Sequence, residues 1–96
     1  MNKSDSFSDA CRSVLKILTA NGFVTRRQQF SAQRGTCCIV ANKGMRFVRV
    51  VASASDNMVK VQRRCWLVYR TFATMNLATD VSTFEEQLSN ILVILK

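Results

Sequence analysis

Residues 37–53, "CCIVANKGMRFVRVVAS", carry the pattern of two strands joined by a tight turn. Two runs rich in β-branched residues, 36–41 and 45–52, flank Asn42-Lys43-Gly44, whose glycine suits the positive φ that a hairpin connection requires. Two cysteines and three basic residues stand in the stretch, with no acid among them. The stretch therefore predicts a basic antiparallel hairpin in the middle of the chain.

The segment before this hairpin has the pattern of a helix followed by a strand. Apolar residues recur at helical spacing between residues 10 and 18, and Gly22 is a typical C-terminal stop. With Ser6 or Ser8 as the N-cap, the expected helix covers residues 7–20. Residues 23–30 are rich in Val, Thr and Phe, which favours a strand.

The segment after the hairpin, residues 58–72 ("MVKVQRRCWLVYRTF"), fits two interpretations. As a strand it places Val59, Val61 and Cys65 on one face, and as a helix it aligns Val61 and Cys65 with later aromatic residues. We favour the strand, because the run is rich in β formers and follows a turn cluster at residues 53–57.

The C-terminal residues predict a second helix. Ser82 or Thr83 would cap it, Glu85 and Glu86 would occupy its first turn, and apolar residues continue to the end of the chain. Residues 91–96 are apolar almost all round, which suggests burial on several sides and a homodimer contact through this helix.

The order of these elements is α-β-β-β-β-α within a single domain, residues 1–96. An antiparallel sheet of three to four strands with both helices packed on one face is the simplest way to bury two apolar helix stripes. The predicted class is therefore α+β. One face of the sheet is left for solvent or for a partner.

The start of the chain and its cysteines bear on the expected location. The first ten residues lack the apolar region of a secretory signal, and the longest apolar run, residues 91–95, is far too short to cross a bilayer. Four cysteines, at positions 11, 37, 38 and 65, stand in apolar or strand-like surroundings typical of reduced, buried thiols. A zinc site is the weaker alternative, because the ligand spacing is wrong. The cytoplasm, a reducing intracellular compartment, is the expected location.

Net charge is the strongest signal in the composition. The whole chain carries +8, but residues 23–70 carry ten bases against Asp56 alone, a balance of +9. The flanking segments carry +1 (residues 1–22) and −2 (residues 71–96). Such a field favours polyanions or acidic protein surfaces. Arginine predominates among these bases, which favours forked contacts with phosphate or carboxylate.

The residue types needed for catalysis are missing. The chain has no histidine, so histidine-based acid–base catalysis and histidine metal sites are excluded. Its six acids form no carboxylate pair in a plausible cleft, and no glycine-rich phosphate loop is present. We expect no enzymatic activity, no cofactor and no metal site.

The order helix, Asn21-Gly22-Phe23, strand and hairpin over residues 8–53 resembles the core of PD-(D/E)XK nucleases. That family carries an Asp on the first hairpin strand, and on the second an acid or Gln, then any residue, then Lys. Here the corresponding positions hold Cys37 (or Cys38), Arg49 and Val51. The resemblance therefore implies a descendant that has lost its magnesium ligands and retains only binding.

We expect the protein to act by binding nucleic acid, DNA or RNA, mainly through phosphate contacts from an arginine-rich sheet or hairpin face. The alternative is a protein-binding inhibitor or adaptor, from a phage or other mobile element, that docks on an acidic protein surface. Arg49 is left out of the expected contacts, since its strand neighbours on the same face, Phe47 and Val51, are apolar. Trp66 could stack on an unpaired base if it shares a face with Arg64 and Arg70. The candidate contacts are Arg26, Arg27, Arg34, Lys43, Arg46, Arg63, Arg64 and Arg70.

Overall fold

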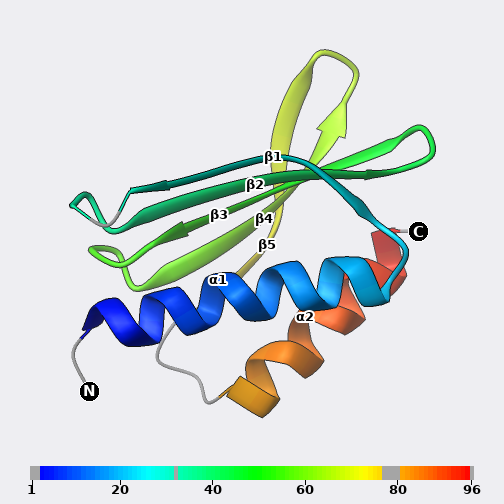
Figure 1. The fold of residues 1–96 in the computed structure, drawn as a ribbon. Helices are drawn as coiled ribbons and strands as arrows, with labels where there is room; N and C mark the ends of the chain where they lie inside the picture. The colour runs from blue at the N-terminus through cyan, green and yellow to red at the C-terminus, as the bar shows by residue number, and fades with distance from the viewer. Residues whose placement is uncertain (1–2, 32, 77–80, 96) are drawn as a thin grey trace.

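The computed structural model describes residues 3–31, 33–76 and 81–95 and shows two layers (Figure 1). One layer is a five-stranded antiparallel sheet in the order β1-β2-β3-β4-β5. Its strands are β1 (Val24–Ser31), β2 (Thr36–Lys43), β3 (Arg46–Ser53), β4 (Met58–Cys65) and β5 (Val68–Asn76). The other layer holds α1 (Lys3–Ala20) and α2 (Val81–Leu95), both on one face of the sheet. The predicted α+β class and the central hairpin are confirmed.

The sheet has one strand more than the upper limit of the prediction. Residues 58–72 form strand, as we favoured, but a turn at Trp66 and Leu67 divides the segment between β4 and β5. The turn was missed because it contains none of the Gly, Pro, Asn, Asp or Ser residues that usually mark one. The extra hairpin projects beyond the rest of the sheet (Figure 1).

Both helices begin earlier than predicted. α1 starts at Lys3, so Ser6 and Ser8 lie inside it and are not caps. No Gly or Pro interrupts the preceding residues, and nothing there stops a helix from extending. α2 starts at Val81, which places Ser82 and Thr83 within its first turn.

Glu85 has a different role from the one predicted for a first-turn acid. Its carboxylate accepts a hydrogen bond from the Ser13 hydroxyl and pairs with the Lys16 ammonium, with both contacts at 3.4 Å. These contacts join α1 to α2. Glu85 therefore holds the helix layer together and does not cap its own helix.

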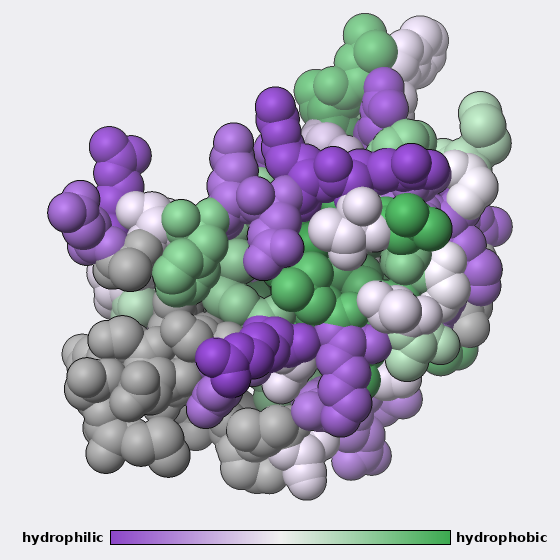
Figure 2. All heavy atoms as spheres, in the orientation of Figure 1, coloured by the Kyte–Doolittle hydropathy of each residue, from purple (hydrophilic) through white to green (hydrophobic). Residues whose placement is uncertain are grey.

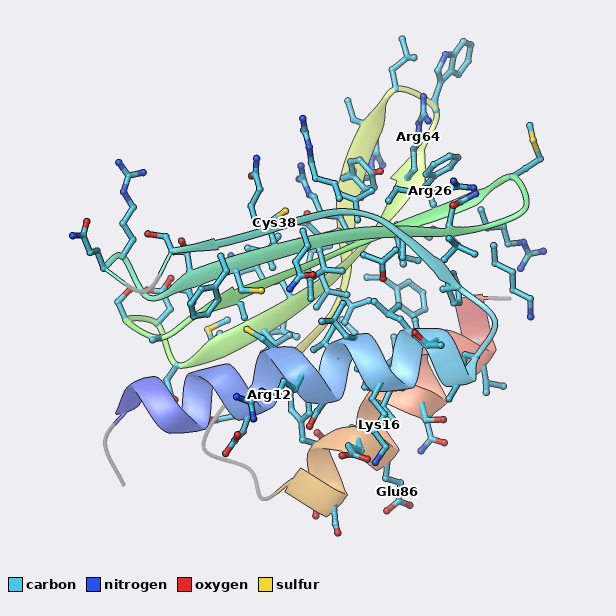
Figure 3. The ribbon with its side chains drawn as sticks, viewed as in Figure 1. Arg12, Lys16, Arg26, Cys38, Arg64 and Glu86 are labelled. Atoms are coloured by element: carbon cyan, nitrogen blue, oxygen red, sulfur yellow. The ribbon has the colours of Figure 1, made fainter. Side chains whose placement is uncertain are left out.

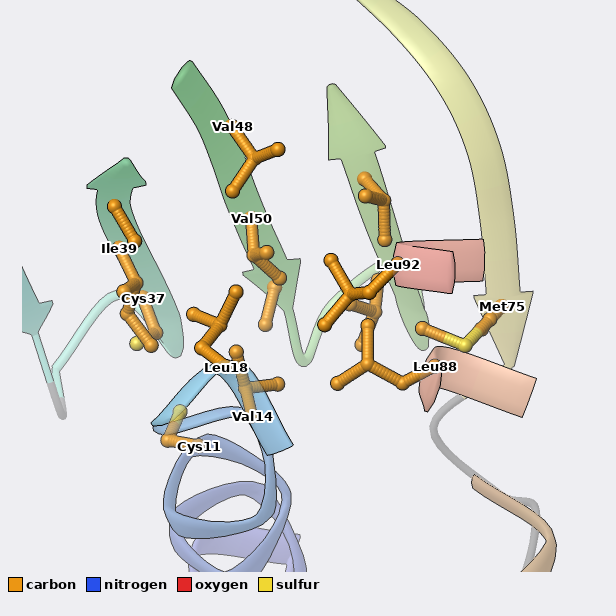
Figure 4. Packing of buried hydrophobic residues seen from close by; sticks show 14 of the residues in the cluster. Cys11, Val14, Leu18, Cys37, Ile39, Val48, Val50, Met75, Leu88 and Leu92 are labelled. Atoms are coloured by element: carbon orange, nitrogen blue, oxygen red, sulfur yellow. The ribbon is translucent and has the colours of Figure 1, made fainter. Parts of the chain in front are cut away.

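The core lies between the sheet and the helix pair (Figure 4). Val14 and Leu18 of α1 and Leu88 and Leu92 of α2 are almost completely buried. They pack against every second residue of the central strands, because alternate side chains of a strand point to the same face. The buried strand residues include Cys37, Ile39, Ala41, Val48, Val50, Ala52, Val59 and Val61.

The last turns of α2 are only partly covered. Val93 and Ile94 are exposed, whereas Leu92 between the two helices and the sheet is fully buried. The helix is therefore not enclosed on all sides by this chain. Association of two copies through α2 stays a prediction.

Candidate nucleic-acid interface

The alternation of β-strands sorts the basic residues onto two sides of the sheet. Arg49 lies opposite Val40 on β2 and Gln62 on β4, all three on the face turned away from α1 and α2. We call this the outer face. Figure 3 shows Arg26 and Arg64 on that side, and Arg12 and Lys16 on the helix side. The cations of the outer face are Arg26, Arg27, Arg49, Lys60 and Arg64.

Only three of the eight predicted contacts belong to the outer face: Arg26, Arg27 and Arg64. Arg34 is separate, beside a hollow of about 260 Å³ at the opposite end of β1 and β2. The other four lie on the side of the sheet that faces the helices, where each is paired across the strands with a core residue or with another of the four. They are Lys43, Arg46, Arg63 and Arg70. The eight residues are close together in the sequence, but the alternation of side chains along each strand places them on different sides of the sheet.

Two outer-face residues were missing from the predicted set. Arg49 alternates with the buried Val48 and Val50, so the period of two places it outside. Lys60 has the same relation to Val59 and Val61. The alternation of apolar and basic residues in the sequence could have identified both positions. For Arg49, however, the apolar neighbours at positions 47 and 51 suggested a side chain that faces the core. Those neighbours form a half-buried layer on the outer face.

Arg49 is held in place by three side chains. Its Nε donates to Gln62 Oε1 at 2.7 Å, and Gln62 Nε2 donates in turn to Thr71 Oγ1 at 3.3 Å. Its Cζ lies 4.6 Å from the centroid of the Tyr69 ring, which is within cation–π range. The guanidinium therefore has a defined position before any ligand binds.

Arg26 and Arg64 are restrained in the same manner. Arg26 stands at a bulge of β1, and its Nε donates to Oδ1 of the buried Asn42 at 2.6 Å. Arg64 Nε donates to the Trp66 carbonyl oxygen at 2.9 Å, and its Cζ lies 5.4 Å from the centroid of the Phe47 ring. In each arginine one of five N–H donors is used on a neutral oxygen, which leaves the terminal NH₂ groups for an anion.

The outer-face cations have no carboxylate beside them in the described part of the chain. None of the five strands contains Asp or Glu. The two ion pairs between described residues both involve α1: Arg12 with Asp9 at 3.7 Å and Lys16 with Glu85 at 3.4 Å. Figure 2 shows hydrophilic side chains along the sheet side of the molecule and also over the helix side. Among the residues that the structure describes, no neighbouring acid neutralises the positive field of this face.

A second basic region lies where the hairpins of the sheet separate. Here Arg46 and Arg63, with Arg64 at the border to the outer face, line a cleft of about 420 Å³. Met45 at the tip of the β2–β3 hairpin and Ile94 of α2 supply apolar walls. We call this the inter-hairpin cleft.

The four cysteines are free, in two different environments. Cys11 and Cys37 are buried between α1 and β2 (Figure 4), where a hydrogen bond to Cys37 and burial raise the pKa of the Cys11 thiol. Cys38 and Cys65 are half-buried, so the prediction of four buried thiols is wrong for these two. Cys38 lies on the outer face (Figure 3), opposite Val51. In the described residues no three potential metal ligands lie together.

Comparisons with known proteins give no assignment. No protein family, curated protein or solved structure matches the chain. The resemblance of residues 8–53 to the PD-(D/E)XK core stays a hypothesis. Neither α1 nor α2 is long and apolar enough to cross a membrane.

Proposed function

We propose that the protein binds nucleic acid through the phosphates, with the outer face of the sheet as its contact surface, and that it has no catalytic activity of its own. One observation carries this proposal: Arg26, Arg49 and Arg64 are each fixed by an Nε bond to a neutral oxygen, on a face formed by strands that contain no Asp or Glu. Guanidinium groups fixed in this manner lose little conformational entropy when they bind an anion. Half or more of the hydrogen bonds in protein–DNA complexes go to phosphate and sugar.

The exposed cations Arg27 and Lys60 extend this surface across the sheet. Arg27 is on β1 opposite Val40, and Lys60 is on β4 opposite Val51. Neither makes a contact with another described side chain that would neutralise its charge. They are therefore suited to phosphate binding. Both side chains are exposed, so we expect their substitution to leave the fold intact.

The first test is fluorescence anisotropy with labelled single- and double-stranded DNA and RNA across a salt series. For a phosphate-binding protein, log affinity falls linearly with log salt. We expect Arg27→Ala with Lys60→Ala to weaken binding to all sequences alike and to reduce the salt slope by about 1.4 to 1.8. The control is Arg12→Ala with Arg34→Ala, which removes the same charge from two exposed residues outside the outer face.

An equal loss in the two double variants would show that net charge, and not the outer face, governs binding. Absence of binding to every nucleic acid at low salt would refute the proposal. The ligand would then be sought among acidic proteins, the alternative for the same cations, with Arg27→Ala and Lys60→Ala as the specificity control in a pull-down.

A further inference from the structure

The β4–β5 hairpin separates from its neighbour before either strand ends. The β3–β4 ladder stops at Val48 and Arg63, yet β3 begins two residues earlier at Arg46 and β4 continues to Cys65. The two hairpin ends diverge from this point (Figure 1). The inter-hairpin cleft of about 420 Å³ lies between them. A cleft of this size is in the range of sites for small ligands and is too small for a duplex.

Two arginines of this hairpin lie so close together that their positive charges repel each other. Arg63 and Arg70 are directly opposite each other in the β4–β5 ladder, a position where like charges are destabilising. Arg63 is further held with its Cζ 5.8 Å from the centroid of the Phe72 ring, and both arginines are exposed. An anion bound beside the pair would relieve this repulsion.

The tip of the hairpin shows a second feature without a role in folding. Trp66 is 88% exposed, so it contributes almost nothing to the core. Its φ of 62° lies in the left-handed region, which favours glycine and strains a bulky side chain. The Arg64 Nε bond to the Trp66 carbonyl fixes the turn in this conformation. The β4–β5 hairpin projects beyond the rest of the sheet (Figure 1), and a strained, exposed aromatic residue at the tip of such a hairpin is typical of a binding position.

Arg64 and Arg70 lie on opposite sides of this hairpin, so the face that the sequence suggested they share does not exist. We propose that the β4–β5 hairpin binds an unpaired nucleotide, with the phosphate held by Arg63 and Arg70, which share the helix-facing side of the hairpin, and the base stacked on Trp66. The ligand of the protein is then single-stranded nucleic acid. This inference rests on the proposed function and adds the class of substrate. Every base presents a face to an aromatic ring, so the contact tolerates any sequence. The cluster of arginines without an acid favours a polyanionic strand over an apolar partner for the same tip.

Trp66 is the only tryptophan of the chain, so its intrinsic fluorescence reports on this contact directly. We expect a short oligothymidine strand to quench the fluorescence and to bind more tightly than a duplex of the same length. Trp66→Gly should weaken binding of the strand by about 5- to 150-fold, the range for loss of one stacked base. It should leave duplex binding unchanged and should not lower the melting temperature, because glycine is favoured at this φ. Trp66→Phe should retain most of the affinity.

The outcomes separate this inference from the proposed function. Tight strand binding by Trp66→Gly, or binding without quenching, would overturn the stacking contact and leave phosphate binding by the outer face in place. No binding of any nucleic acid would overturn both. The last measurement records Trp66 fluorescence in the presence of vesicles of phosphatidylserine and phosphatidylcholine. A blue shift of Trp66 fluorescence with these vesicles, without any effect of oligothymidine, would assign the tip to a membrane surface instead.

Discussion

At the scale of single residues, the placement of each arginine matters more than the number of arginines. Arg27 and Arg49 both carry a charge on the outer face, but only Arg49 is bonded to Gln62 and stacked on Tyr69. A planar fork held in a fixed direction binds phosphate differently from a mobile point charge. A lysine can therefore replace the charge at position 27, but at position 49 it cannot replace the fixed planar fork.

We expect Arg49→Lys to weaken nucleic-acid binding by about 2- to 30-fold, because the ring contact and the fork are both lost while the charge remains. Arg27→Lys, the matched control, should change the affinity by less than about 2-fold, since it retains the point charge that phosphate contacts require. Both variants are measured in the anisotropy titration at one salt concentration. Equal losses at the two positions would show that the restraint of Arg49 has no effect on binding.

At the scale of elements, the helices support the sheet, and their substitution acts on stability. Leu88 is completely buried in α2 between the sheet and α1, whereas Val93 on the same helix is more than half exposed. Side chains in close-packed cores leave a cavity when they are truncated. Substitutions at these two positions compare the buried side of α2 with its exposed side.

Leu88→Ala should lower the free energy of unfolding by about 2–5 kcal/mol, measured by urea denaturation followed by circular dichroism. Val93→Ala should change it by less than about 0.5 kcal/mol, because the side chain loses little buried area. A large loss at Val93 would indicate that this part of α2 is covered in solution by a second copy of the chain. Size-exclusion chromatography with light scattering would then show the dimer.

At the scale of the whole molecule, the two layers divide structure from binding. The helix layer and the inner face of the sheet hold the core, and the outer face holds five cations. The cysteines lie in both regions. Cys11 and Cys37 are between the two layers, and Cys38 is on the outer face. Thiol alkylation can therefore locate the ligand without any substitution.

In the free protein we expect iodoacetamide to modify Cys38 and Cys65 quickly and Cys11 and Cys37 only on unfolding, because the second pair is buried. Saturating nucleic acid should slow the modification of Cys38. Mass spectrometry of the digested protein gives each rate. Unchanged reaction of Cys38 in the complex would place the ligand away from the outer face, and the rates of Cys11 and Cys37 serve as the control for unfolding.

Part of this architecture follows from local sequence. The central hairpin, both helices and the absence of histidine chemistry are readable because period-two and period-3.6 patterns and the turn residue Gly44 act over short distances. The excess of bases in residues 23–70 is likewise a property of composition, and it predicted a polyanionic ligand. The start of α1 and the turn at Trp66 were not readable, because neither carries the residues that usually mark a boundary.

The site itself required the tertiary structure. Arg63 and Arg64 are adjacent in sequence but face opposite sides of β4, whereas Arg27 and Arg49 come from different strands and share one face. Strand register and the choice of buried face decide these groupings, and both depend on which side the helices cover. The sequence determined that the middle of the chain is basic and folds as hairpins. Packing of α1 and α2 against one face of the sheet decided which cations meet, because burial of the helix stripes leaves only the other face open.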